Sequence, residues 1–515
     1  MRLVELYLQR IALYNGKLKA ALAVSSQALR EAQELDRERQ EGRIRGPLHG
    51  VPVALKDNIL AFGMPTTAGA LAFEGFQAPY EATLVQNLRL AGAILLAKTQ
   101  LTELANWVAV GMPTNYSALG GFGLNPYDPR RDPRLDPGDG RPVLATGGSS
   151  SGTGTAASLW VANVGTETSG SILSPAGQNS LVGLKPTVGR ISRHGIVPIT
   201  LDQDTAGPMA RTVRDVAILF GVLEGDRPDP KDPATGRCPR PDGGDYTPFL
   251  DAGALRGARL GVPRAYFVEA IQPPGETEPR GGLDPARRAL FEQAIAKLRE
   301  LGAEVIDPTD LPSILHPDPE RNFLRWPVCH AYEDRKGRDA HCSIVLKYGM
   351  KRDFERWLES LGPAAPVRSL ADLRRFNLER QKAGAIHYGQ ARLDISDEMD
   401  GVRDRSRYLR DREKDLELAQ VSGLDAVFQA HRLDAVVFPA NLGADVAARA
   451  GYPSLIVPAG FYPPQLEGLP PGFEPQPAPF GITFTGPACS EPRLLALGFA
   501  FEQATHHRKP PKEFP

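Results

Sequence analysis

Two glycine-flanked serine turns lie near each other in the sequence, and they constrain the fold more than any other feature. The first is Gly147-Gly-Ser149-Ser-Ser-Gly152, and the second is Thr168-Ser-Gly-Ser171. Glycine permits positive φ angles and lets a substrate approach the backbone closely. Consecutive backbone N–H groups in such a turn can bind an oxyanion. The stretch therefore combines a hydroxyl nucleophile with a site for a developing negative charge.

A serine hydroxyl is a weak nucleophile unless a base activates it. Lys56 follows the apolar run Val51-Pro-Val-Ala-Leu55, which predicts a buried strand. Burial lowers the pKa of a lysine, so that a neutral amine can accept a proton. The alternative is an ordinary lysine at a strand end whose amine reaches water. The two serine turns downstream favour the base.

Two other interpretations of the first serine turn are a phosphate-binding loop and a flexible linker. A phosphate-binding loop would need the pattern Gly-x-x-x-x-Gly-Lys-Ser/Thr, and no lysine lies in this turn. A flexible Gly/Ser linker would not be followed at once by the strand-like run Leu159-Trp-Val-Ala-Asn-Val164. Neither interpretation accounts for the segment.

Several further motifs together resemble the amidase signature family. They are Lys56-Asp-Asn58, Gly165-Thr-Glu-Thr-Ser-Gly-Ser-Ile172, Gly183-Leu-Lys-Pro-Thr187 and Asp204-Thr-Ala-Gly-Pro-Met209. The resemblance runs from Arg43 to Leu495, and the motifs are most similar to those of the stand-alone bacterial amidases, which include peptide amidases. It implies an α/β fold with a large mixed β-sheet between helical layers. It also implies hydrolysis of an amide through a covalent acyl-enzyme, without a cofactor or a metal.

The resemblance also implies roles for individual residues. Ser171 matches the acyl-forming nucleophile, and Ser149 matches a bridging serine that has a cis peptide bond in this family. Lys56 matches the general base. The backbone N–H groups that match the oxyanion hole belong to Thr168, Ser169, Gly170 and Ser171.

The chain departs from the family pattern at three places. The linker between Ser149 and Ser171 is about two residues shorter, so we expect a trimmed or re-registered helix after Ser151. Ser169 stands where glycine or aspartate is usual. Leu173-Ser174 replaces a step that contains arginine in glutamine-amidotransferase subunits. The last difference favours a stand-alone amidase over the alternative, an ammonia-generating subunit like the amidase-type component of glutamyl-tRNA amidotransferase.

Composition limits the classes of partner. The chain has 515 residues, 42% of them hydrophobic, which is enough for a large core. The net charge of −1 gives no reason to expect nucleic acid or an anionic membrane as a partner. The sequence lacks an apolar run of membrane-spanning length. The four cysteines are too sparse for a disulfide scaffold, so we expect a reducing compartment, the cytoplasm.

Strand-like and helix-like segments alternate along the chain and indicate one α/β catalytic domain over residues 1–515. Residues 1–42 are expected to form an N-terminal arm of two helices, and residues 318–430 a mostly helical insertion on the substrate side. Strands are also predicted near residues 93–98, 260–263, 304–306, 434–439, 453–458 and 479–484. The loop 130–144 looks inserted relative to the family pattern, and it leads directly into the first serine turn. It is therefore either part of the mouth of the site or a solvated surface loop.

Histidines and cysteines offer weak alternatives to serine chemistry. Cys329-His330 and His341-Cys342 invite a zinc interpretation, but adjacent ligands on a helix point apart and the Cys-x-x-Cys spacing is missing. His49 is expected to be structural. We therefore expect no metal site. The expected partner is a small-molecule or peptide amide substrate, a homodimer is left open, and the natural amide is not defined.

Overall fold

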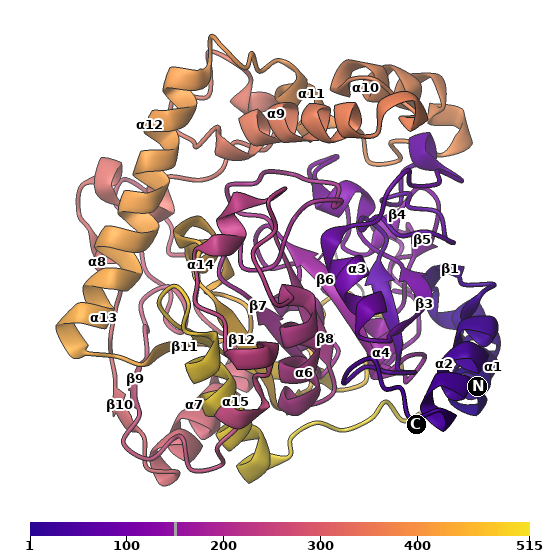
Figure 1. The fold of residues 1–515 in the computed structure, drawn as a ribbon. Helices are drawn as coiled ribbons and strands as arrows, with labels where there is room; N and C mark the ends of the chain where they lie inside the picture. Colours follow the sequence, from indigo (N-terminus) through magenta and orange to yellow (C-terminus); the bar gives the residue numbers. More distant parts are fainter. Residues whose placement is uncertain (149–151, 515) are drawn as a thin grey trace.

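The structure is a computed structural model that describes residues 1–148 and 152–514. Eleven strands of this described part form one mixed sheet, in the order β1-β3-β2-β6-β8-β7-β12-β13-β11-β9-β10. Helices pack around the sheet, as Figure 1 shows. The α/β fold with a large mixed sheet is the one that the sequence predicts.

The strands of the large sheet are β1 Ala21–Val24, β2 Pro52–Lys56, β3 Ile94–Thr99, β6 Ala162–Glu167, β7 Val182–Lys185, β8 Thr205–Ala210, β9 Arg259–Gly261, β10 Glu304–Ile306, β11 Ala435–Pro439, β12 Ser454–Tyr462 and β13 Ala478–Thr485. A small separate ladder joins β4 Tyr116–Ser117 to β5 Gly121–Phe122. Strand β2 is parallel to both of its neighbours, β3 and β6. Because parallel strands end at the same edge of a sheet, Lys56 and Glu167 lie at one edge.

The helices are α1 Arg2–Leu18, α2 Ala28–Gln40, α3 Thr83–Leu90, α4 Thr153–Ala156, α5 Leu173–Gln178, α6 Val213–Glu224, α7 Pro285–Glu300, α8 Pro312–Leu315, α9 Val345–Ser360, α10 Leu370–Glu379, α11 Ala391–Asp397, α12 Arg405–Leu416, α13 Ala426–His431, α14 Ala444–Ala450 and α15 Glu491–Thr505. A π-helical segment, η11 Glu417–Asp425, joins α12 to α13. The side chain of Thr212 caps helix α6 by accepting a hydrogen bond from the N–H of Asp215. Helix α4 is a single turn, in keeping with the short linker.

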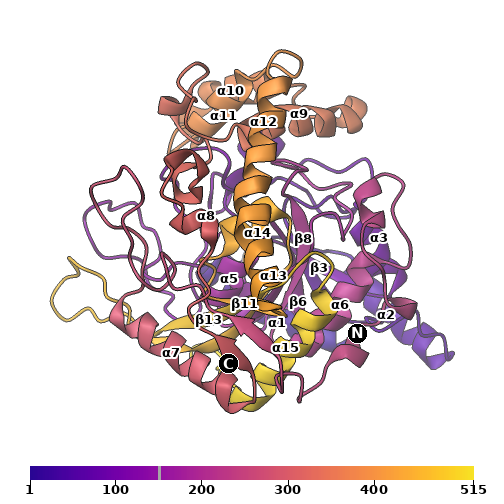
Figure 2. The same ribbon diagram turned by 90° about the vertical axis from the view of Figure 1, so that its left-hand side faces the viewer.

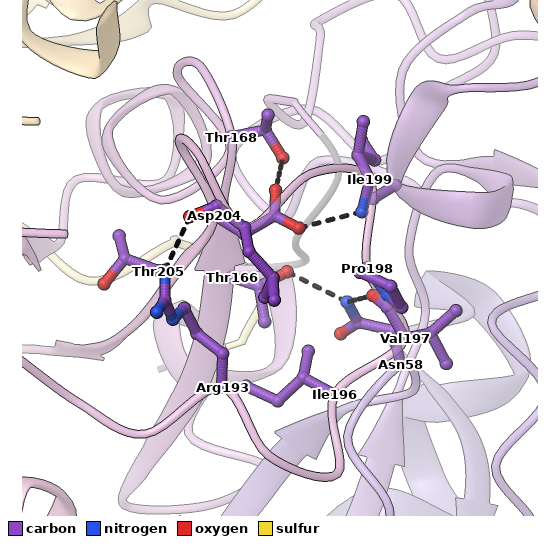
Figure 3. A pocket seen from close by; sticks show the side chains of 12 residues that line it. Asn58, Thr166, Thr168, Arg193, Ile196, Val197, Pro198, Ile199, Asp204 and Thr205 are labelled. Atoms are coloured by element: carbon purple, nitrogen blue, oxygen red, sulfur yellow. Dashed lines mark hydrogen bonds between the residues drawn. The ribbon is translucent and has the colours of Figure 1, made fainter. Parts of the chain in front are cut away.

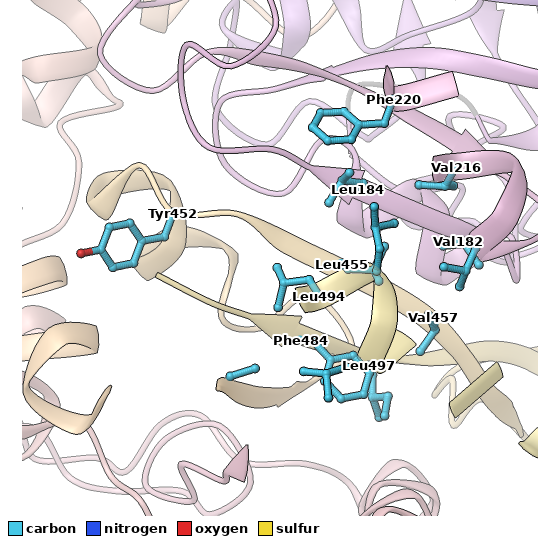
Figure 4. Close-up of a cluster of buried hydrophobic side chains, with 14 of the residues drawn as sticks. Val182, Leu184, Val216, Phe220, Tyr452, Leu455, Val457, Phe484, Leu494 and Leu497 are labelled. Atoms are coloured by element: carbon cyan, nitrogen blue, oxygen red, sulfur yellow. The ribbon is translucent and has the colours of Figure 1, made fainter. Parts of the chain in front are cut away.

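The central strand β12 shows how both faces of the sheet are covered. Side chains alternate between the faces of a strand. Leu455 and Val457 belong to the large core that α6 and α15 help to form (Figure 4). Ile456 instead packs in the cluster that contains α5. Glycines allow the close approach: a Cβ on Gly177 of α5 would lie 2.9 Å from Ile456, and one on Gly498 of α15 would lie 2.4 Å from Leu455.

Helices α9 to α12, which we call the helical layer, lie across one side of the molecule (Figure 1). From this layer α12 runs toward α13 and the sheet, as Figure 2 shows in a view turned by 90°. A second hydrophobic cluster fills the space beneath the layer, and it includes Phe73, Trp107, Phe354 and Trp357. Phe354 and Trp357 of the predicted helical insertion thus share a core with Phe73 and Trp107, which lie outside it.

The first 42 residues contain an element that the sequence analysis missed. Two helices are present as predicted, but the segment between them forms β1, which pairs antiparallel with β3 at the edge of the sheet. The N-terminal arm is therefore not purely helical. Helix α1 ends at Lys19, a left-handed residue with φ of 52°, and this turn sends the chain into the strand.

The cysteines contradict the expectation of reduced thiols. All four, each within the described residues, form disulfides: Cys238 with Cys489, and Cys329 with Cys342. The second bond also removes both thiols of the zinc interpretation. Because disulfides persist mainly in oxidising compartments, the cysteines no longer support the cytoplasm.

None of the helices in residues 1–148 and 152–514 combines the length and the apolar character that crossing a membrane requires.

Candidate active site

Lys56 ends β2, which lies between β3 and β6, and is fully buried. Its amine donates hydrogen bonds to the Oγ1 of Thr166 at 2.6 Å and to the carbonyl oxygen of Thr166 at 3.0 Å. Burial lowers the pKa of Lys56 to about 7, while the nearby carboxylates of Asp204 and Glu167 oppose this shift. A pKa near 7 makes a substantial fraction of the amine neutral at neutral pH.

The two residues after Lys56 are also anchored. Asp57 forms a buried ion pair with Lys98 of the neighbouring strand β3, at 2.8 Å. Asn58 donates through its Nδ2 to the Oγ1 of Thr166 at 3.1 Å. Breaking a buried pair by removing one partner costs about 3–5 kcal/mol, so Lys98 is a strong constraint on the end of β2. Lys98 was missed in the sequence because Ala93-Ile-Leu-Leu-Ala-Lys98 gives only a strand signal.

Residues 168–171, which we call the serine turn, connect β6 to α5. Gly170 adopts a φ of 88°, a conformation that favours glycine. Glu167 at the end of β6 folds over the turn, and its Oε2 accepts hydrogen bonds from the N–H groups of Ile172 at 2.7 Å and Leu173 at 3.0 Å. These bonds fix the first turn of α5 directly after Ser171.

Asp204 holds the other side of the serine turn. The hydroxyl of Thr168 donates to its Oδ1, and the N–H groups of Ile199 and Thr200 donate to its Oδ2 at 2.8 and 3.0 Å. Burial raises the pKa of Asp204 to about 7, against the hydrogen bond from Thr168 and those from the backbone. Asp204 was quoted in a motif of the sequence, but its contact with Thr168 could not be inferred from spacing.

A small cavity of about 10 Å³ lies beside the serine turn and is shown in Figure 3. Its walls include Asn58, Thr166, Thr168 and Asp204. A cavity of this size holds about one water molecule. Asn58, Thr166 of β6 and Thr168 of the serine turn thus meet at one small cavity.

The first serine turn approaches the second through its glycines. A Cβ on Gly148 would lie 3.2 Å from the Cα and 3.4 Å from the Oγ of Ser171, and one on Gly147 would collide with Pro175 at 2.2 Å. Ser149 itself lies outside the described residues, as does the cis peptide bond predicted there. The residue that precedes it therefore lies against Ser171, as the pairing of the two motifs requires.

The predicted oxyanion hole lies beside an acidic side chain of α14. In the described part of the chain, the N–H groups of Ser169 and Gly170 donate to no acceptor. The side chain of Ser169 is exposed, and its Oγ lies 3.4 Å from the Oδ1 of Asp445 in α14. Asp445 in turn pairs with Arg449 at 3.1 Å. Asp445 was missed because it is far from the serine motifs in sequence.

Other candidate groups do not join this site. His49 is buried, and its Nε2 lies 2.9 Å from the carbonyl oxygen of Leu35 while its Nδ1 accepts from the N–H of Arg45, which is a structural role. The described residues contain no group of three or more His, Cys, Asp or Glu side chains that could hold a metal ion.

The family model of the amidases matches residues 2–495 of the chain. The chain belongs to the amidase family. A solved structure of native peptide amidase from Stenotrophomonas maltophilia is 39% identical, with a TM-score of 0.80, and the match covers 99% of this chain and 94% of that one. The amidase signature interpretation and its fold are therefore confirmed, and the chain is a hydrolase that acts on amide bonds.

Two curated relatives of this amidase represent the two functions that the sequence left open. A probable amidase of Arabidopsis thaliana is 35% identical over 99% of this chain and 88% of its own length. A glutamyl-tRNA(Gln) amidotransferase component of Chloroflexus aurantiacus is 33% identical over 99% of this chain and 94% of its own length.

Proposed function

We propose that this protein is a stand-alone amidase that hydrolyses a carboxylic or peptide amide through Ser171, Ser149 and Lys56. The observation that carries the proposal is the buried amine of Lys56, whose pKa is lowered to about 7. It is bonded to Thr166, five residues before Ser171 on the strand that leads into the serine turn. A neutral amine in this position can act as a base toward a serine hydroxyl.

The proposed reaction moves one proton along the three side chains. Lys56 takes the proton of Ser149, and Ser149 takes the proton of Ser171 as the Oγ of Ser171 attacks the amide carbonyl. The C–N bond then breaks, the leaving amine receives the proton through the same relay, and an ester of Ser171 remains. A water molecule hydrolyses this ester after giving a proton to the relay, which releases the carboxylic acid.

The serine turn supplies the stabilisation of the tetrahedral oxyanion in this mechanism. The N–H groups of Thr168, Ser169, Gly170 and Ser171 are the donors that we propose. Glu167 and Asp204 hold both ends of the turn, so the donors need little reorganisation during the reaction. Removal of one such donor typically costs roughly 3–4 kcal/mol of transition-state stabilisation.

The test is product release from a panel that contains a peptide amide, an anilide, a carbamate and a short aliphatic amide. We expect turnover of at least one compound and none by Ser171→Ala, whose fold should be intact because Ser171 forms no part of the hydrophobic core. The thermal unfolding of the variant controls for folding. Substantial amide hydrolysis by Ser171→Ala would contradict the assigned nucleophile.

A second candidate function is ammonia generation within a larger assembly, which the likeness to the glutamyl-tRNA(Gln) amidotransferase component favours. It predicts that the protein hydrolyses glutamine only with a co-purifying partner. Purification under mild conditions, followed by glutaminase assay of the isolated chain and of any complex, distinguishes the two. Turnover of the amide panel by the isolated chain supports the stand-alone enzyme.

A further inference from the structure

The loop 130–144, together with the residues that flank it, is built from a repeated ion pair. Within residues 128–141 an aspartate binds the guanidinium group of an arginine two positions later, three times: Asp128 with Arg130, Asp132 with Arg134, and Asp139 with Arg141. Each aspartate also accepts from the backbone N–H of its arginine. The repeat gives the loop a defined shape without regular secondary structure.

The three pairs make different contacts outside the loop. Arg130 and Arg134 donate to the carbonyl oxygens of Glu474 and Glu467, which lie in the connection between β12 and β13. The third pair instead reaches the helical layer. The hydroxyl of Tyr388, between α10 and α11, donates to the Oδ2 of Asp139 at 2.7 Å.

Tyr388 belongs to an aromatic cluster that joins the layer to the small β4–β5 ladder. Its ring meets the ring of Tyr116 edge-on, with centroids 5.0 Å apart. Tyr116 also packs against Phe122 at 4.9 Å and His387 at 5.9 Å. The rings of Tyr116 and Tyr388 are only partly buried.

Hydrogen bonds connect this cluster to the candidate active site. The N–H of Asn115, next to Tyr116, donates to the Oγ1 of Thr102 at 2.7 Å. Thr102 donates in turn to the carbonyl oxygen of Gly148 at 2.8 Å, and Gly148 lies against Ser171. Two hydrogen bonds, through Asn115 and Thr102, therefore connect the aromatic cluster to Gly148, the residue that precedes Ser149.

A second connection runs along the same segment. The N–H of Ala118 donates to the buried carboxyl of Glu103 at 2.8 Å. Ala105, two residues after Glu103, lines the cavity beside the serine turn. The segment that contains the ladder is thus connected both to Gly148 and to the cavity beside the serine turn.

We propose that Tyr116 and Tyr388 form an aromatic wall that binds the acyl side of the substrate and selects amides with an aromatic or large apolar acyl group. Asp139 is the positioning residue that holds Tyr388 in this wall. This proposal rests on the proposed amidase function. Tyrosine rings suit the role because they offer a large, rigid apolar surface while the hydroxyl group is bound elsewhere.

The first experiment compares N-acetylphenylalaninamide with acetamide as substrates of Tyr388→Phe. The variant keeps the ring and loses the bond to Asp139. We expect KM for the aromatic amide to rise about tenfold, which corresponds to about 1.4 kcal/mol, with kcat and the acetamide kinetics unchanged. Tyr332→Phe is the matched control, because Tyr332 donates to an aspartate, Asp394, elsewhere in the layer. Equal changes in both variants, or in both substrates, would overturn the wall.

The second experiment compares two aspartates of the same loop. Asp139→Asn should raise KM for the aromatic amide about as much as Tyr388→Phe does, whereas Asp132→Asn should leave it unchanged. Both variants weaken an Asp–Arg pair, so a general loosening of the loop would affect them alike. If Asp132→Asn has the larger effect, Asp139 does not position Tyr388 for binding.

Binding can be tested separately from turnover. Calorimetric titration of N-acetylphenylalaninamide into Ser171→Ala should give a dissociation constant that rises about tenfold when Tyr388→Phe is added. Selective binding without turnover by the wild-type chain would contradict the proposed amidase and leave the wall intact. Turnover without selectivity for the aromatic amide would contradict the wall and leave the amidase intact.

Discussion

The serine turn and the helical layer are held in place by opposite means. The turn is fixed by two buried carboxyl groups, Glu167 and Asp204, each of which binds backbone N–H groups or a threonine hydroxyl. The layer is held by the hydrophobic cluster beneath it and by pairs of partly exposed side chains, such as Lys351 with Asp397 and Arg374 with Asp394. Exposed pairs are each worth only about 0–1 kcal/mol.

This difference indicates that the serine turn and the helical layer have separate roles. A buried contact to the backbone sets an atomic position, so that its loss changes the chemistry. A set of exposed ion pairs is redundant, and single members can change without loss of the fold. The layer is therefore suited to vary with the substrate while the turn stays constant, and the following variants test this division.

The largest effect is expected for Lys56→Met, which removes the proposed base from the end of β2. We expect kcat/KM to fall by at least about 10³-fold, as for other members of a serine relay. In the wild type only the neutral amine is active, so activity should rise with pH and level off above about 7, the pKa of Lys56. Steady-state kinetics between pH 5 and 9 measures both. A rate that stays flat well into acid would exclude a lysine base.

The matched control is Lys347→Met in the layer. Lys347 is also fully buried and pairs with Glu398 at 3.0 Å. Its loss should lower the stability because Glu398 loses its partner, but the pH profile and kcat of a small amide should not change. Equal losses of kcat in both variants would remove the distinction between the two regions.

The disulfide Cys329–Cys342 tests the layer alone. It closes a short loop beneath α9, with a sequence separation of 13. A bond that closes a loop of about 15 residues contributes about 3 kcal/mol in the chain-entropy account. We expect the double variant Cys329→Ser/Cys342→Ser to unfold at a lower temperature, with the turnover of acetamide unchanged. Calorimetry and the same assay measure both, and a matching fall in kcat would show that the layer also positions the reacting groups.

Much of the turn could be predicted from the sequence, because its chemistry depends on residues that are adjacent along the chain. The strand that ends at Lys56 and the glycine turn before Ser171 are local patterns. In contrast, Asp57 meets Lys98 and Asp139 meets Tyr388 only through the tertiary structure. Propensity and spacing contain no information on such pairs.

Short elements and cysteine pairing were also out of reach. Strand β1 has only four residues and lies directly after a helix, so it shows too few alternations to be recognised. Cys238 and Cys489 are 251 residues apart, and the sequence contains no signal that joins them. Composition alone predicted free thiols, since sparse cysteines are the rule in reducing compartments.

A smaller effect is expected for Glu167→Gln in the serine turn. The neutral amide still accepts a hydrogen bond, but bonds to a charged acceptor are roughly twice as strong as those to a neutral one. The N–H groups of Ile172 and Leu173 should be held less tightly, and we expect kcat to fall about tenfold with little change in KM. Glu398→Gln in the layer is the control and should leave kcat unchanged. A selective rise in KM for Glu167→Gln would instead place its effect on substrate binding.

The smallest effect, and the sharpest test of the electrostatics, is expected for Asp204→Asn. The Asp204 carboxylate opposes the lowering of the pKa of Lys56 that burial causes. Its removal should therefore lower the pKa of Lys56 further, so that the acidic limb of the activity profile moves to lower pH by less than about one unit. The activity on the plateau above pH 7 should also fall modestly. Asparagine has an NH2 group in place of one carboxylate oxygen, and this donor would face either a backbone N–H or the hydroxyl of Thr168, which are donors themselves. If the limb stays in place while the plateau falls, Asp204 only positions the turn. If the limb moves to higher pH in the variant, the charged Asp204 of the wild type must lower the pKa of the titrating group. A negative charge raises the pKa of a lysine, so this result would contradict Lys56 as the titrating group.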